Sequence, residues 1–135
     1  MTWDDAVADW LAVVAADSVV QGLLGTAPEF NLAGERDYVV PSLEYTLISP
    51  AVPFREVFWR TLVQLDMWMS SLADLTALEA ALVRLLHHEV PVTLGTTPMW
   101  SQMIVGGAPL SGAADGVWGR SMDFHLIYLR SRYAA

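Results

Sequence analysis

The chain has 135 residues, and this length predicts a single domain over residues 1–135 with its own core. It has no cysteine, which excludes a disulfide framework, a zinc-thiolate site and a thiol nucleophile. Seven basic residues, all arginine, stand against fifteen acidic ones, so the formal net charge is −8. That balance argues against a protein whose main task is to grip phosphate backbones.

The composition also points to partner chains. Apolar residues make up 54% of the chain and charged residues 16%, with six tryptophans and six methionines. Large apolar side chains beyond the needs of a small core usually cover partner surfaces, so we expect an oligomer. The N-terminus carries acids where a signal peptide carries bases, and no apolar run approaches the roughly 20 residues that span a bilayer. We therefore expect no membrane association, and a protein used in a cytoplasm or an assembly.

The N-terminal region predicts two helices followed by a loop. Thr2 can cap the first helix, and an apolar stripe at helical spacing follows it: Trp3, Val7, Trp10, Leu11 and Val14. Residues 17–24 form a second, short helical segment that ends at Gly25. The glycine, proline and asparagine content of residues 25–37 predicts a loop.

The next region predicts an antiparallel hairpin. Residues 38–48 and 58–70 both alternate like strands, and Pro41 marks the first of them as an edge strand or a strand that begins late. The connection, residues 49–56, holds two prolines and therefore predicts a loop instead of a tight two-residue turn.

The C-terminal half predicts a long helix and a second hairpin. Residues 71–89 carry a leucine stripe flanked by alanines, and Pro91 closes this helix. The sequence predicts a short strand at residues 98–105, a glycine-rich loop at 106–116 and a long final strand at 117–130. The fold class is therefore α+β: an antiparallel or mixed sheet of about four strands with helices packed on one face, in the order α-(α)-β-β-α-β-β.

The strand at residues 58–70 has two unlike faces. Its odd positions from Trp59 to Met69 are apolar apart from Thr61, which is typical of a face laid on a core. Its even positions mix large apolar and charged side chains: Phe58, Arg60, Leu62, Gln64, Asp66 and Trp68. This second face needs an explanation in a chain too small to cover both sides of a sheet.

Two groups of residues could carry chemistry. His87, His88 and Glu89 are adjacent, whereas metal ligands on a helix sit three or four residues apart, so histidines at a helix C-terminus are the favoured interpretation. His125 could meet Asp66 or Glu44 across the sheet as an acid-base pair. Because no nucleophile motif accompanies that pair, a polar cross-strand contact is the favoured alternative.

The remaining motifs do not indicate an enzyme. The glycines of residues 104–116 lack the lysine and the following helix that a phosphate-binding loop requires. The tryptophans could stack on bases or sugars, but few bases lie near them, which favours packing. Arg55 and Arg60 flank aromatic residues and are assigned first to a contact between subunits. We predict no catalytic residue, no cofactor and no metal site.

Three segments resemble a known family. Residues 63–86, "VQLDMWMSSLADLTALEAALVRLL", resemble the strand-turn-helix centre of the small tail-terminator (tail-completion) proteins of long-tailed, non-contractile bacteriophages and related prophages. Residues 115–130 look like the closing strand of that family, and residues 15–25 are similar to its N-terminal segment. The order and length match over nearly the whole chain, while the tryptophan and methionine content and the proline-rich residues 49–54 depart from the family.

The resemblance implies a structural virion protein. It implies a homo-oligomeric ring, usually of six copies, at the head-proximal end of the tail, assembled in the host cytoplasm. Such a ring ends polymerisation of the tail tube protein and meets the head-tail connector, while genomic DNA passes through without specific binding. The mixed face would then meet a neighbouring subunit through Arg55, Phe58, Arg60, Leu62, Gln64, Asp66 and Trp68. Alternatives are another neck or head-closure component, and a small hydrolase or ligand-binding domain using His125.

Overall fold

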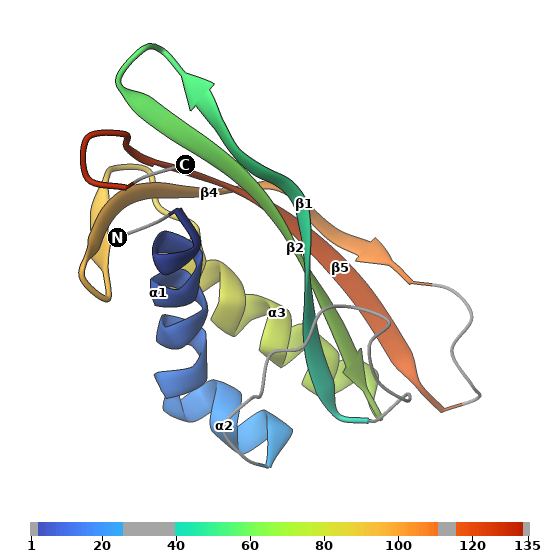
Figure 1. Cartoon of the computed structure of the whole chain (residues 1–135). Helices are drawn as coiled ribbons and strands as arrows, with labels where there is room; N and C mark the ends of the chain where they lie inside the picture. The colour runs from blue at the N-terminus through green and yellow to red at the C-terminus, as the bar shows by residue number, and fades with distance from the viewer. Residues whose placement is uncertain (1–2, 26–39, 111–115, 134–135) are drawn as a thin grey trace.

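The computed structural model describes residues 3–25, 40–110 and 116–133. Within these ranges the chain forms two layers, three helices on one face of a five-stranded antiparallel sheet (Figure 1). The strands lie in the order β1-β2-β5-β4-β3. The elements are α1 (Trp3–Ala16), α2 (Ser18–Leu24), β1 (Ser42–Phe54), β2 (Phe58–Met69), α3 (Leu72–Leu86), β3 (Val92–Leu94), β4 (Thr97–Pro109) and β5 (Trp118–Leu129). The predicted α+β class is confirmed.

The helices begin and end where local chemistry favours it. Asp17 caps α2 by accepting hydrogen bonds from the amides of Val19 and Val20, and Gly25 ends the helix in the left-handed conformation. Ser71 caps α3 by accepting from the amide of Asp74. The predicted long helix ends at Leu86, three residues earlier than expected, and His87 is its C-cap.

The core lies between the helices and the covered face of the sheet. Leucines of α3, including Leu78 and Leu82, are fully buried against Val63 and Leu65 of β2 and Phe124 of β5. Trp10 of α1 is also fully buried, with its ring edge-on to Phe124 at 5.3 Å between centroids. The indole nitrogen of Trp10 donates to the Ser101 hydroxyl at 2.8 Å, so its polar atom is satisfied inside the core.

Polar contacts fix α1 against the β3–β4 hairpin. The carboxylate of Asp9 accepts hydrogen bonds from the Thr96 amide at 3.0 Å and from the Thr96 and Thr97 hydroxyls at 2.9 and 2.8 Å. Gly95 adopts a φ of +60° in this turn and lies so close to Asp9 that an added Cβ would be 2.9 Å from its Cγ. The close approach and the backbone conformation both favour glycine at this position.

Three expectations about the strands are wrong. Residues 49–54 continue β1 instead of forming a loop, because register shifts between Leu47 and Val52 accommodate the prolines on an edge strand. The connection to β2 is a tight turn of three residues in which Arg55 and Glu56 both have positive φ. β3 adds a fifth strand, and β4 runs through the expected glycine-rich loop as far as Pro109, with shifts in register after Met103.

Several expectations fall outside the described residues. These are the Thr2 cap, most of the loop at residues 25–37, and part of the loop at residues 106–116. The described part holds no single helix long and apolar enough to cross a membrane, and only α1 and α2 together, bent by 71°, reach that length and composition. Trp10, Val14 and Val20 of this bent pair are fully buried in the core.

Candidate functional site: the open face of the sheet

The second face of the sheet lies away from all three described helices (Figure 1). We call it the open face. Along β2 the odd positions from Trp59 to Met69 are all at most 8% exposed, as predicted for a face laid on a core. The even positions point the other way, and five of the six are only partly buried. The sequence pattern therefore located both faces of this strand correctly.

The predicted interface residues occupy one row of the open face. Phe58, Arg60, Leu62, Gln64, Asp66 and Trp68 alternate along β2, flanked by β1 and β5. Arg55 lies in the exposed turn that precedes this row. Asp66 is the most buried member at 9% exposed. The structure brings these residues onto one surface, and their contact with a second chain stays a prediction.

Arginines gather at the turn end of this row. The guanidinium groups of Arg55 and Arg60 lie 5.2 and 5.6 Å from the centre of the Phe54 ring, within the range of cation-π contacts. The Nε atom of Arg60 is buried without a hydrogen-bond partner. Buried donors normally have a partner, so this end of the face carries an incompletely satisfied cation.

Acids gather toward the other end of the row. Glu44 of β1 lies opposite Asp66, and Asp123 of β5 lies opposite Gln64. Burial raises the pKa of Asp66, and a hydrogen bond from the Gln64 amide nitrogen, at 2.8 Å, lowers it only in part. Burial and the neighbouring charge of Asp66 raise the pKa of Asp123. The open face therefore has a basic end and an acidic end.

The proposed acid-base pair of His125 does not form. The structure places His125 between Leu62 and Gln102, and its Nε2 lies 3.1 Å from the Gln102 side-chain oxygen. Asp66 lies opposite Ser121, four residues away along β5. Burial and the positive charge of Arg60 lower the pKa of His125. A histidine bonded to a side-chain amide is a polar cross-strand contact, the alternative that the sequence favoured.

His87 and His88 cap the edge of β4. The His88 amide donates to the Ser101 carbonyl at 3.0 Å, and His87 Nδ1 accepts from the Met103 amide at 3.0 Å. His87 Nε2 lies 3.3 Å from a carboxylate oxygen of Glu89. Within the described ranges no three histidine, aspartate or glutamate side chains are grouped to hold a metal ion. These histidines therefore protect a strand edge, which the sequence interpretation did not anticipate.

An apolar hollow of about 230 Å³ opens at the basic end of the sheet. Its walls on the open face are Phe58 of β2, Trp100 of β4, and Ile127 and Leu129 of β5. Phe58 and Trp100 meet edge to face with ring centres 5.9 Å apart. The hollow is smaller than the roughly 300–1,000 Å³ of small-molecule sites and suits one or two side chains of a partner. Sequence reasoning missed this hollow because β2, β5 and β4 are brought side by side only by pairing between strands far apart in the chain.

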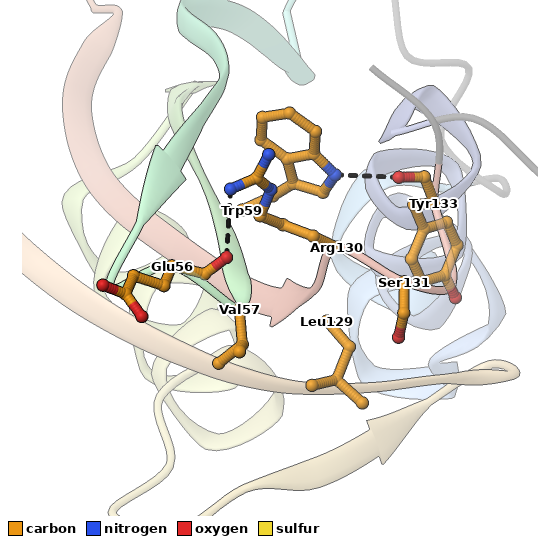
Figure 2. A pocket seen from close by; sticks show the side chains of 7 residues that line it. All are labelled: Glu56, Val57, Trp59, Leu129, Arg130, Ser131 and Tyr133. Atoms are coloured by element: carbon orange, nitrogen blue, oxygen red, sulfur yellow. Dashed lines mark hydrogen bonds between the residues drawn. The ribbon is translucent and has the colours of Figure 1, made fainter.

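A second hollow, of about 580 Å³, is lined by seven residues from the turn before β2, from β2 and from the end of β5 and the turn after it: Glu56, Val57, Trp59, Leu129, Arg130, Ser131 and Tyr133 (Figure 2). Arg130 lies over Trp59 with its guanidinium 4.7 Å from the ring centre, and donates to the Glu56 carbonyl at 3.0 Å. The Trp59 indole donates to the Tyr133 carbonyl at 2.8 Å. These bonds hold the turn between β1 and β2, and the start of β2, against the turn that follows β5. The lining of this hollow includes one aliphatic hydroxyl, Ser131, and no histidine.

The fold has a known counterpart in a virus-like particle. A chain in a solved structure titled "Virion of native gene transfer agent (GTA) particle" is similar to this chain with a TM-score of 0.58, over 90% of this chain and 92% of that one. The two sequences are 14% identical, so the likeness concerns the fold. No protein-family model matches this chain. No curated protein sequence matches it either.

Proposed function

We propose that this chain is a structural virion protein that acts by assembly. It forms a ring, with six copies as the expected number, at the head-proximal end of a phage tail. The ring ends polymerisation of the tail tube protein and joins the tail to the head connector. The observation that carries the proposal is the mixed open face, whose row from Phe58 to Trp68 combines large apolar and charged side chains away from the helices.

The chemistry of that row suits contacts between identical chains. Apolar anchors such as Phe58 and Leu62 supply burial, while Arg60 and Gln64 can fix the register between copies. The likeness in fold to a chain of a gene transfer agent virion, covering nearly all of both chains, supports a place in a particle of this kind. The partner of His125 is an amide, which disfavours the hydrolase alternative.

The charge of the chain also agrees with a ring around DNA. Six copies at −8 each carry a formal charge of −48. A negative wall repels phosphates, so genomic DNA can pass without sticking. Another neck or head-closure component is the alternative within the same class of protein, and both would use the open face for assembly.

The test is assembly of the purified protein. Native mass spectrometry and negative-stain images should show a closed ring, alone or with the tail tube protein encoded in the same genome. Leu62→Glu places a charge in the centre of the open face and should abolish the ring. Val19→Glu is the matched control, since Val19 is 49% exposed on α2, and it should leave the ring intact. A chain that stays monomeric under both conditions would refute the proposed function.

A further inference from the structure

The two ends of β5 carry complementary apolar features. Leu129, at its C-terminal end, is 45% exposed on the rim of the apolar hollow. Trp118, at its N-terminal end, is 47% exposed and lies opposite Met69 of β2, so it projects from the helix side at the end of the sheet. The strand between them has a length of roughly 36 Å at the usual rise per residue. An exposed tryptophan at one end of a strand and an apolar hollow at the other end suit a head-to-tail contact between copies.

The charges at these two ends are also complementary. Arg55, Arg60 and Arg130 lie at the hollow end together with Glu56, and none of these arginines forms an ion pair within the described ranges. Toward the Trp118 end lie Glu44, Asp66 and Asp123 on the open face, and the exposed Asp74 in the first turn of α3. The positive charge of Arg120 at this end is paired with Glu79 at 2.7 Å. Opposite charges at opposite ends favour contact of one end with the other end of the next copy and disfavour contact of like ends.

We propose that the apolar hollow of one copy receives Trp118 of the next copy, with Arg55 and Arg60 of the first facing Asp74 of the second. This inference rests on the proposed ring and names the contact that closes it. A tryptophan that becomes buried in the hollow of the next copy, with the exposed Arg55 and Asp74 at the rim of the contact, has the composition of an interface hot spot. Leu72, which is 44% exposed at the start of α3, follows Met69, the partner of Trp118, by three residues and adds exposed apolar area at this end of the chain's sheet.

Truncation of the Trp118 side chain is the first test. Trp118→Ala should raise the concentration needed for half-maximal assembly at least about tenfold, since tryptophan anchors commonly contribute that much. Val19→Ala removes a similarly exposed apolar side chain from α2 and should change it less than about twofold. Arg55→Glu should weaken assembly, and adding Asp74→Arg should restore part of it. Thermal melts followed by circular dichroism confirm that each variant folds.

Crosslinking tests the contact directly, because the native chain has no cysteine. A double variant, Val57→Cys with Leu72→Cys, places thiols at the two ends while keeping Trp118 and the hollow. These positions lie at opposite ends of the twelve-residue strand β2. The two thiols of one molecule are therefore too far apart to form a disulfide with each other. Oxidation should therefore yield a ladder of linked copies, whereas Val57→Cys with Val19→Cys should give no ladder.

The outcomes separate this contact from the ring itself. A ladder together with loss of assembly in Trp118→Ala supports the contact. If the wild-type chain forms a ring but Trp118→Ala matches Val19→Ala and no ladder appears, this contact is wrong and the ring stands. If the wild-type chain forms no ring, alone or with its tube protein, the proposed function fails as well.

Discussion

The two faces of β2 differ in what surrounds them, although their residues alternate along one strand. Val63 and Leu65 are fully buried under the helices, while Leu62 and Gln64 between them remain partly exposed. A leucine on the covered face packs in a filled core, whereas a leucine on the open face has none of the three described helices over it. The comparison teaches that apolar content alone does not show whether a face is a core or an interface. The following substitutions test that difference.

The largest effect is expected in the covered core. Trp10→Ala should lower the free energy of unfolding by about 3–5 kcal/mol, because it removes a fully buried ring and leaves Ser101 without its donor. Leu62→Ala on the open face should cost below about 1.5 kcal/mol in the monomer, since that side chain is partly exposed. Urea unfolding of both variants measures the difference, and equal losses would contradict the distinction between the two faces.

The next effect concerns Asp9, on the helix side. Asp9→Ala should cost about 2 kcal/mol, because the carboxylate accepts hydrogen bonds from the Thr96 amide and from the Thr96 and Thr97 hydroxyls. Burial acts to raise the pKa of Asp9, but the bonds from Thr97 and Thr96 outweigh it and lower the pKa below 3.8. The stabilisation should therefore be full above pH 3.8 and disappear as the pH falls through the lowered value.

Unfolding as a function of pH tests this prediction. Asp4→Ala on the same helix is the control, because Asp4 is exposed in the first turn and should contribute at most about 0.5 kcal/mol, through the helix dipole. A loss for Asp9→Ala that is as large near pH 2 as near pH 7 would show that the charge is not what holds the hairpin.

A smaller effect is expected where Trp68 crosses Gly119 on the open face. An added Cβ at Gly119 would overlap the Trp68 ring, so Gly119→Ala must displace this ring and should cost about 1 kcal/mol. Gly22→Ala is the contrasting variant, since nothing lies within 4 Å of an added Cβ at Gly22 in α2, and it should stabilise by roughly 0.5–1 kcal/mol. Melting temperatures and near-ultraviolet circular dichroism check both changes. An unchanged tryptophan spectrum in Gly119→Ala would speak against the overlap.

The smallest effect, and one of opposite sign, is expected at Asp66. Burial raises its pKa, so the ionised carboxylate destabilises the fold at neutral pH and this cost vanishes as the pH falls toward 3.8. Asp66→Asn should therefore stabilise the monomer near pH 7 by up to about 1 kcal/mol and leave stability unchanged near pH 3. Chemical denaturation at the two pH values measures this, and a loss of stability at neutral pH would contradict the assignment.

Local signals predicted most of the elements. Helical spacing of apolar residues located α1 and α3, and alternation located β2 and β5, because each pattern reports one face of one element. The turn at Arg55 and Glu56 was missed since neither residue is the glycine or asparagine that normally marks positive φ. β3 was missed because it has only three residues, although Gly95 before Thr96 is a hairpin signal that could have revealed it.

The sequence by itself determined the fold class and which residues of β2 lie on each face, because the helical and strand periods of about 3.6 and 2 residues depend only on neighbours along the chain. Only the tertiary structure decided that His125 meets Gln102 instead of Asp66, and that Phe58, Trp100, Ile127 and Leu129 surround one hollow. These groupings depend on which strands pair and in which register. The pairing of β5 with both β2 and β4 joins residues far apart in the chain, which no local pattern records.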